Sequence, residues 1–170
     1  MVGQKSKYIT ICASLILIMT LSACDKYVNT YSFANNQGEE ILRCFNEGDK
    51  EKLKSMFSKR QRERKELDSE IGEAMKFIDG KIISHYPSCF GGDSDAIDDG
   101  EVAYINVSLN IDDIKTDTGK KYTLSGLYYI KNKKDPNNIG LIVITIYEEQ
   151  VENDTDYSDN PQVTIGKYGY

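Results

Sequence analysis

The spacing of hydrophobic residues changes once along the chain, close to Gly80. Before this point apolar residues recur every three or four positions, which is the period of a helix with one buried face. The pattern predicts a first helix that carries Ile41, Leu42 and Phe45 and stops at Gly48. Two further helices are expected. Their apolar and start or stop residues are Asp49, Leu53, Met56 and Phe57 for the second, and Asp68 or Ser69, Ile71, Ala74, Met75, Phe77, Ile78 and Gly80 for the third.

After Gly80 the apolar residues alternate with polar ones, which is the period of a strand with one buried face. Four strands are predicted, at residues 81–86, 101–111, 120–131 and 138–149. The last of these has apolar residues on both faces, which is typical of a strand covered on both sides. Turns are expected at Asp99-Gly100, at Thr118-Gly119 and at residues 135–138. Residues 162–170 could form either a weak edge strand or a loose tail.

Helices first and antiparallel strands second indicate an α+β fold, with N-terminal helices packed on a curved antiparallel sheet of about four strands. The predicted organisation is a leader at residues 1–23, a polar tether at 24–36, the folded domain at 37–150 and a polar linker with a C-terminal tail at 151–170. A tether is predicted because residues 25–36 are polar, rich in asparagine and without an apolar period.

The leader has the features of a bacterial export signal. Lys5 and Lys7 precede an almost wholly apolar run at residues 9–21, which is too short to span a membrane but long enough for a secretory signal. The run ends in Leu21-Ser22-Ala23-Cys24, which resembles the lipobox of bacterial lipoproteins. This resemblance implies cleavage before Cys24, lipid (including palmitate) on that cysteine, and a location on the extracytoplasmic face of the cell membrane.

Composition then excludes some classes of function. The 170 residues include 21 Lys and Arg against 27 Asp and Glu, which gives a net charge of −6. Cleavage would remove Lys5 and Lys7 but no acidic residue, so the 147-residue mature chain would carry −8. An acidic chain is a poor partner for nucleic acid, so none is expected. The charge run at residues 58–66 could be a basic partner-binding face, but a solvated helix surface is the commoner case because acidic residues interrupt it.

The four cysteines do not form a simple disulfide framework. Cys12 leaves with the leader and Cys24 takes the lipid, which leaves Cys44 and Cys89. In an exported protein these two can form one disulfide, or they can remain two separate, partly buried thiols. No metal site is expected, because zinc sites use closely spaced ligand pairs and the chain has a single histidine, His85.

Several segments between Glu39 and Glu149 resemble an uncharacterised family of bacterial lipoproteins, that of the domain of unknown function 5104. The matching segments are residues 41–58, 77–82, 119–122 and 140–142. The first of them is also similar to the opening helices of the NTF2-like superfamily, which implies a cone-shaped α+β domain with a pocket between helices and sheet. The family resemblance implies a fold but no activity.

A pocket of the NTF2-like kind would offer few catalytic groups here. His85, Tyr86, Tyr122 and Tyr128 are the candidate pocket residues, because a histidine and tyrosines could move a proton and stabilise an oxyanion. No strand places an acidic residue within an apolar stretch. Strand histidines without a role and tyrosines that pack a sheet are the commoner case, so no catalytic residue is assigned.

The acidic stretch at residues 93–101 invites a calcium hypothesis, but it does not fit the EF-hand loop. A loop that starts at Asp93 has Ile97 at position 5, and one that starts at Asp95 has Asn106 in place of the final glutamate. We expect a solvated hairpin loop instead.

Three functions are open to such a chain. The leading hypothesis is a non-enzymatic lipoprotein, anchored to the membrane by lipid, that binds an unknown partner protein or small ligand without a cofactor. The alternatives are a pocket enzyme of the isomerase or dehydratase type and a structural component of the cell envelope.

Overall fold

The fold is α+β, as the change of period predicts. A computed structural model describes residues 28–149 and 160–168, in which four helices come before six strands. The helices are α2 (Thr30–Glu47), α3 (Lys50–Met56), α4 (Lys59–Arg62) and α5 (Leu67–Phe77). The strands are β1 (Ile82–Ser84), β2 (Phe90–Asp98), β3 (Glu101–Thr116), β4 (Lys121–Asn132), β5 (Gly140–Glu148) and β6 (Gln162–Gly166), and a 3₁₀ turn, η1 (Pro136–Asn138), precedes β5.

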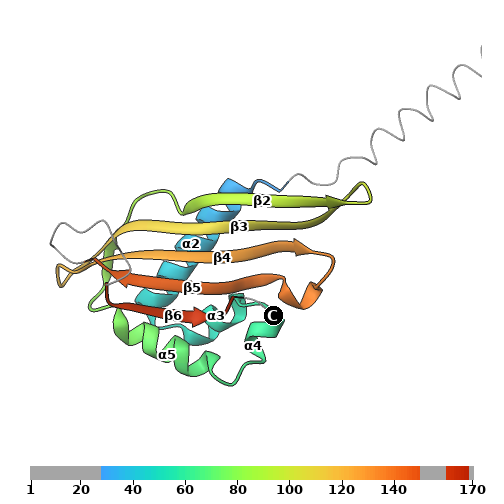
Figure 1. The fold of residues 1–170 in the computed structure, drawn as a ribbon. Coiled ribbons are helices and arrows are strands. Elements are labelled where there is room, and N and C mark those ends of the chain that lie inside the picture. The colour runs from blue at the N-terminus through green and yellow to red at the C-terminus, as the bar shows by residue number, and fades with distance from the viewer. Residues whose placement is uncertain (1–27, 150–159, 169–170) are drawn as a thin grey trace, which may run out of the picture.

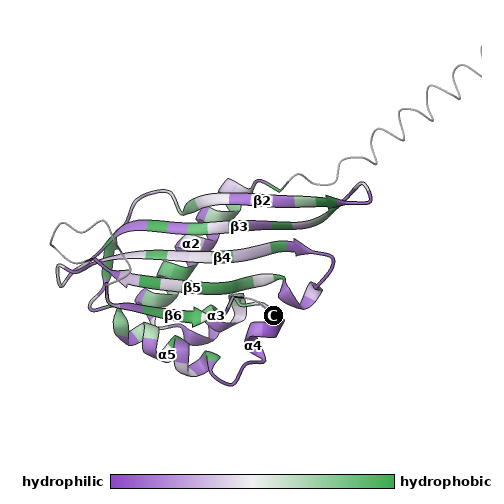
Figure 2. Ribbon diagram, viewed as in Figure 1, coloured by the Kyte–Doolittle hydropathy of each residue, from purple (hydrophilic) through white to green (hydrophobic). Residues whose placement is uncertain are grey.

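All six strands belong to one open antiparallel sheet. Its order is β1-β3-β4-β5-β6, and β2 also pairs with β3. In Figure 1, α2 runs diagonally behind the strands, and α3, α4 and α5 lie beside β6. Figure 2 shows β5 as hydrophobic over much of its length and α4 as hydrophilic, which fits an inner strand and a surface helix.

The ends of the first helices follow from their capping residues. Asn29 accepts a hydrogen bond from the Ser32 amide at 2.9 Å and so begins α2. Gly48 ends it in the left-handed conformation, with φ of 68°, where glycine has no steric cost. The side chain of Asp49 then accepts from the Lys52 amide at 3.0 Å and begins α3. These two boundaries confirm the sequence prediction.

The start of α2 was predicted wrongly. The helix begins at Thr30, whereas residues 30–36 were assigned to the tether and the domain was expected to start near Gln37. The fully buried residues in the first turns of α2 are small, Ala34 and Gly38, and Phe33 is only partly buried. Small side chains give a weak hydrophobic period, so sequence alone could not distinguish this helix start from a polar linker.

The predicted number of strands was also too low. Residues 90–98 form β2, although the acidic stretch was expected to be a loop, and residues 162–166 form β6, the edge-strand alternative for the tail. In β2 every residue is exposed or half-buried, so no hydrophobic alternation marks it as a strand. The hairpin turn itself was predicted correctly, with positive φ at Asp99 (51°) and Gly100 (77°).

The buried residues of strand β3 change from odd to even positions halfway along. Val107, Leu109 and Ile111 point to the helices, and then the pairing with β4 shifts register before Ile114. Asp113 has a φ of 53° in this bulge. After it, residues of the other parity, Ile114 and Thr116, are buried.

The interior between helices and sheet is filled by side chains. Ile41, Leu53, Phe57, Leu124 and Ile144 are all at most 1% exposed. Tyr122 is buried among them, and its hydroxyl accepts from the Asp79 amide at 3.0 Å and donates to the Phe77 carbonyl at 3.3 Å. This tyrosine therefore closes the end of α5 against the sheet.

Helix α2 lies in close contact with Cys89 at Gly38. A Cβ atom at this position would lie 2.5 Å from the Sγ atom of Cys89, which is far too short for two non-bonded atoms. The Cys89 side chain is short and fully buried, so it cannot move away. Glycine at position 38 is therefore required by packing.

We expect Gly38→Ala to lower the free energy of unfolding by about 1–3 kcal/mol, because the added methyl group overpacks the contact with Cys89. Gly72→Ala is the matched control, since Gly72 lies inside α5 and its Cβ would meet only Lys50 Nζ, at 3.9 Å. The control should be stabilised by up to about 1 kcal/mol through helix propensity. Urea unfolding of the three proteins measures both changes, and a Gly38→Ala protein as stable as the wild type would contradict the packing argument.

Candidate functional site

The candidate site is formed by the segment between β1 and β2, residues 85–89, which we call the arch. Both strands pair with the same edge of β3, and the arch spans the gap between them. Its ends are held by hydrogen bonds from the Tyr86 amide to the Asp112 carbonyl (2.8 Å) and from the Asn110 amide to the Cys89 carbonyl (3.0 Å). Pro87 lies between them and has no amide proton for strand pairing.

Helix α2 is bonded to the arch and to the strand before it. The Asn46 side chain donates to the Ile82 carbonyl (3.1 Å) and accepts from the Ile82 amide (2.8 Å). Nearer the start of the helix, Asn35 Oδ1 accepts from the Cys89 amide at 2.7 Å. These bonds fix how α2 lies against the sheet edge.

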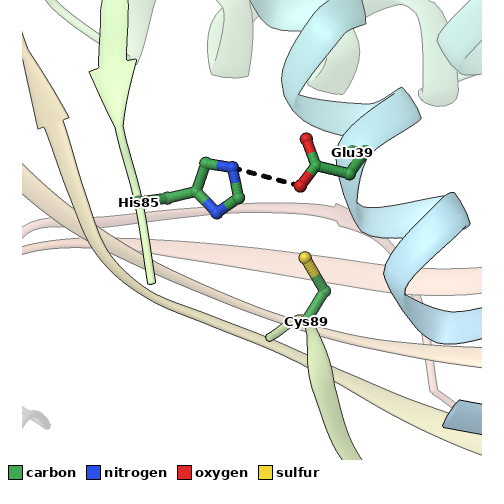
Figure 3. Close-up of side chains that lie close together, drawn as sticks. All are labelled: Glu39, His85 and Cys89. Carbon is green, nitrogen blue, oxygen red and sulfur yellow. Dashed lines mark ion pairs between the residues drawn. The ribbon is translucent and has the colours of Figure 1, made fainter. Parts of the chain in front are cut away.

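Three side chains of different chemistry converge where α2 meets the arch. Glu39 comes from the helix, and His85 and Cys89 come from the two ends of the arch (Figure 3). One carboxylate oxygen, one imidazole nitrogen and the thiol sulfur all lie within 4.8 Å of one another. His85 Nε2 is 3.3 Å from Glu39 Oε1. We call these three residues the Glu-His-Cys cluster.

The exposure of the cluster falls from one member to the next. The side chain of Glu39 is 59% exposed and that of His85 is 18% exposed, whereas Cys89 is fully buried. The cluster therefore extends from the surface into the edge of the core.

The hydrogen bonds of His85 determine its tautomer. Its Nδ1 atom is 2.7 Å from the Tyr86 carbonyl oxygen, and because a carbonyl only accepts, Nδ1 carries the proton. In the neutral ring the lone pair then lies on Nε2, the atom that faces Glu39.

A surface groove of about 310 Å³ begins at the same place and runs between α2 and β1. It combines charged, amide and apolar side chains. They are Glu39, Leu42, Arg43, Asn46, Glu47, Ile82, Ile83, Ser84 and His85. Arg43 pairs with Glu40 and Glu47, and its hydrogen bonds to Glu40 help to lower the pKa of that carboxyl group to about 2. The groove thus carries fixed charges beside an exposed isoleucine.

The predicted pocket residues do not come together. Tyr122 lies in the core, Tyr128 packs edge-on against Phe33, and Tyr86 is 57% exposed. Tyr122 and Tyr128 are six residues apart on β4, which is about 20 Å along a strand. Only His85 of the four lies at the candidate site with its side chain, and Tyr86 contributes its carbonyl oxygen.

The possible disulfide is not formed. Cys44 and Cys89 are both free and buried. Gly38 is the residue of α2 that touches Cys89, and Cys44 lies six residues beyond it. Six residues correspond to about 9 Å along the helix axis. Disulfide-bonded cysteines need Cβ atoms about 4 Å apart.

Burial makes both thiols weak acids. It raises the pKa of Cys89 to about 11, with a contribution from the negative charge of Glu39, and the pKa of Cys44 to about 11 as well. Because the thiolate is the nucleophilic form, Cys89 is a poor nucleophile at neutral pH despite the nearby histidine.

No metal site was predicted from the sequence, because the chain has a single histidine and no closely spaced pair of cysteines. His85 and Cys89 are in fact four residues apart, a spacing visible in the sequence. The contribution of Glu39 could not be found in this way, since it depends on how α2 crosses the arch. That crossing depends on the part of the helix that was predicted as a tether.

Residues 40–149 match the family described as domain of unknown function (DUF5104), and the chain belongs to this family. His85 and Cys89 lie within the matched residues, and Glu39 precedes them directly. A comparison with curated proteins gave no match. Of the helices that the structure describes, none is long and apolar enough to cross a membrane.

We expect the free energy of unfolding to decrease between about pH 9 and pH 11, because both thiols keep their protons in the folded state above the pH at which they ionise in the unfolded state. The stabilising contribution is complete below pH 9 and is lost as the pH passes 11. Urea unfolding as a function of pH measures it, with Cys44→Ala and Cys89→Ala each expected to flatten the decrease. An unchanged slope in both variants would show that the thiols are not its cause.

Proposed function

We propose that the protein is a bacterial lipoprotein whose α+β domain binds a small ligand or a partner protein at the extracytoplasmic face of the cell membrane. The observation that carries this proposal is the sequence Leu21-Ser22-Ala23-Cys24 directly after a short apolar run with a basic start. These residues lie outside the described part of the chain. Lipid on Cys24 would supply the attachment to the membrane.

The position of α2 supports an anchored domain that lies close to the membrane. The helix begins at Thr30, six residues after Cys24. Six extended residues span at most about 20 Å, so the anchor would hold the helix start within that distance of the lipid.

We further propose that the domain is of the NTF2-like cone type, with its binding surface at the rim. Helices at the N-terminus that cover one face of an antiparallel sheet support this assignment. The groove between α2 and β1 is the binding surface we favour, because the space between helices and sheet is occupied by the core.

A binding role is favoured over catalysis by two observations. The four candidate pocket residues are spread over the core, the sheet and the surface, so they cannot act on one substrate atom. The one thiol near a histidine is buried and has a raised pKa.

The anchor predicts that a Cys24→Ala variant, expressed in bacteria supplied with an alkyne analogue of palmitate, takes up no label, because the acylated thiol is absent. Cys12→Ala is the matched control, since Cys12 lies in the apolar run, and it should be labelled like the wild type. Labelling is read on a gel after coupling the alkyne to a dye. Equal labelling of Cys24→Ala and wild type would refute lipid attachment at this cysteine.

The groove predicts that small molecules that raise the melting temperature of the wild-type protein lose their effect in Ile83→Arg, because a long charged side chain fills the groove beside His85. Ile97→Arg is the control, since both isoleucines are similarly exposed (66% and 70%) but Ile97 lies on β2 near the hairpin turn. Thermal unfolding with a small-molecule library measures the shifts. Hits that act equally on both variants would place the binding surface elsewhere.

A further inference from the structure

We propose that the Glu-His-Cys cluster binds a divalent transition-metal ion of the zinc type through Glu39 Oε1, His85 Nε2 and Cys89 Sγ. Carboxylate oxygen, imidazole nitrogen and thiolate sulfur are the three ligand types that zinc uses in proteins. The site goes beyond the binding function proposed above and does not depend on the lipid anchor.

The distance between the two outer ligands already fits a metal ion. Zinc holds oxygen and nitrogen ligands at about 2.0–2.2 Å with tetrahedral angles, which places two such atoms about 3.3–3.5 Å apart. His85 Nε2 and Glu39 Oε1 are 3.3 Å apart. With a zinc–sulfur bond of about 2.3 Å, the sulfur should lie about 3.6 Å from each of them. All three atoms are within 4.8 Å of one another, so the sulfur and each partner need to approach by about 1.2 Å at most.

The orientation of the histidine is that of a metal ligand. Its Nδ1–H group donates to the Tyr86 carbonyl at 2.7 Å, which fixes the ring and leaves the Nε2 lone pair free. Metal-binding histidines are commonly held in this way by a backbone carbonyl on the second nitrogen. The Nε2 atom faces a carboxylate oxygen at 3.3 Å, and this contact is favourable when either a proton on Nε2 or a metal ion lies between the two atoms.

Cys89 is held in place before any metal arrives. Its amide donates to Asn35, its carbonyl accepts from Asn110, and its side chain packs against Gly38. Zinc would replace the thiol proton: the S–H bond breaks, a zinc–sulfur bond forms, the proton leaves to solvent, and no oxidation state changes. The charge of the ion offsets the cost of ionising a buried thiol.

Because Glu39 is exposed, a metal ion could reach the cluster from solvent, and it would keep one coordination position open. Three protein ligands leave the fourth position of a tetrahedral ion open, and the groove adjoins Glu39 and His85 on the surface side. A water molecule or a donor atom of a bound molecule can occupy it. Because one of the three ligands is mostly exposed, the ion should exchange with solvent more readily than in a closed structural site.

Cobalt is the probe that tests this site, because a bond between cobalt and thiolate gives a charge-transfer absorption that oxygen and nitrogen ligands do not. The experiment uses the full chain in detergent with Cys12→Ala and Cys24→Ala, so that Cys44 and Cys89 are the remaining thiols. We expect the band to saturate at one cobalt ion per chain and to disappear when zinc displaces the cobalt. Zinc alone should also raise the melting temperature.

Substitutions at the cysteines and at the other two ligands distinguish the proposed metal site from cobalt bound by a single thiol elsewhere. Cys89→Ala should lose the band, whereas Cys44→Ala, which removes an equally buried thiol on α2, should keep it. Glu39→Gln alters an exposed side chain and should fold like the parent, yet bind cobalt at least about tenfold more weakly. His85→Gln should weaken binding at least as much.

Three results would overturn the proposal: no band in the parent chain, a band that survives Cys89→Ala, or a Glu39→Gln variant with undiminished affinity. If Cys89→Ala does not fold, the Glu39→Gln result decides. The cobalt experiment uses a chain without Cys24, so its result does not depend on lipid attachment. Failure of the metal site and failure of the anchor are therefore distinguishable.

Discussion

The contact between Gly38 of α2 and Cys89 of the arch is the constraint on which the rest of the structure depends. Only a residue without a side chain lets the helix come this close, and the close approach brings Asn35 within 2.7 Å of the Cys89 amide and Asn46 within reach of both polar groups of Ile82. An edge strand with free amide and carbonyl groups is a site for unwanted pairing. Here the two asparagines bond groups of that edge, so one helix both packs the core and closes the end of the sheet.

The bulge in β3 explains why the candidate site lies at the edge of the sheet and not in the interior. Strand β3 bulges at Asp113, and after the bulge residues of the other parity are buried, so the core continues past it with Ile114. The arch crosses opposite this bulge, where strand pairing is interrupted on both sides, and its side chains are therefore free to face α2 instead of the sheet. The groove and the Glu-His-Cys cluster are consequences of one interruption in the sheet.

Sequence could predict the parts of this fold that carry a strong period or a capping residue. The alternation at residues 101–111 of β3, the stop at Gly48 and the cap at Asp49 are of this kind, and each was placed correctly. The continuation of β3 to Thr116 was not predicted, because the bulge at Asp113 breaks the alternation. The start of α2 and the whole of β2 were missed because the first fully buries only an alanine and a glycine and the second fully buries no residue. Of the site, the spacing of His85 and Cys89 was visible, but the position of Glu39 follows from the crossing of α2 and could come only from the three-dimensional structure.

Helix α2 also connects the two proposals of function. If lipid holds Cys24, the helix start lies within about 20 Å of it, and Glu39, nine residues along the helix, is about 14 Å further. The groove would then lie within about 35 Å of the membrane surface. A ligand at this distance would reach the groove either from the cell envelope or from the membrane. A net charge of −8 on the mature chain would repel anionic headgroups, so the covalent anchor, and not the protein surface, would keep the site in this layer. The carboxylate of Glu39, at the outer end of the Glu-His-Cys cluster, would in contrast attract cations. This agrees with the zinc-type ion that the three ligands of the cluster suit.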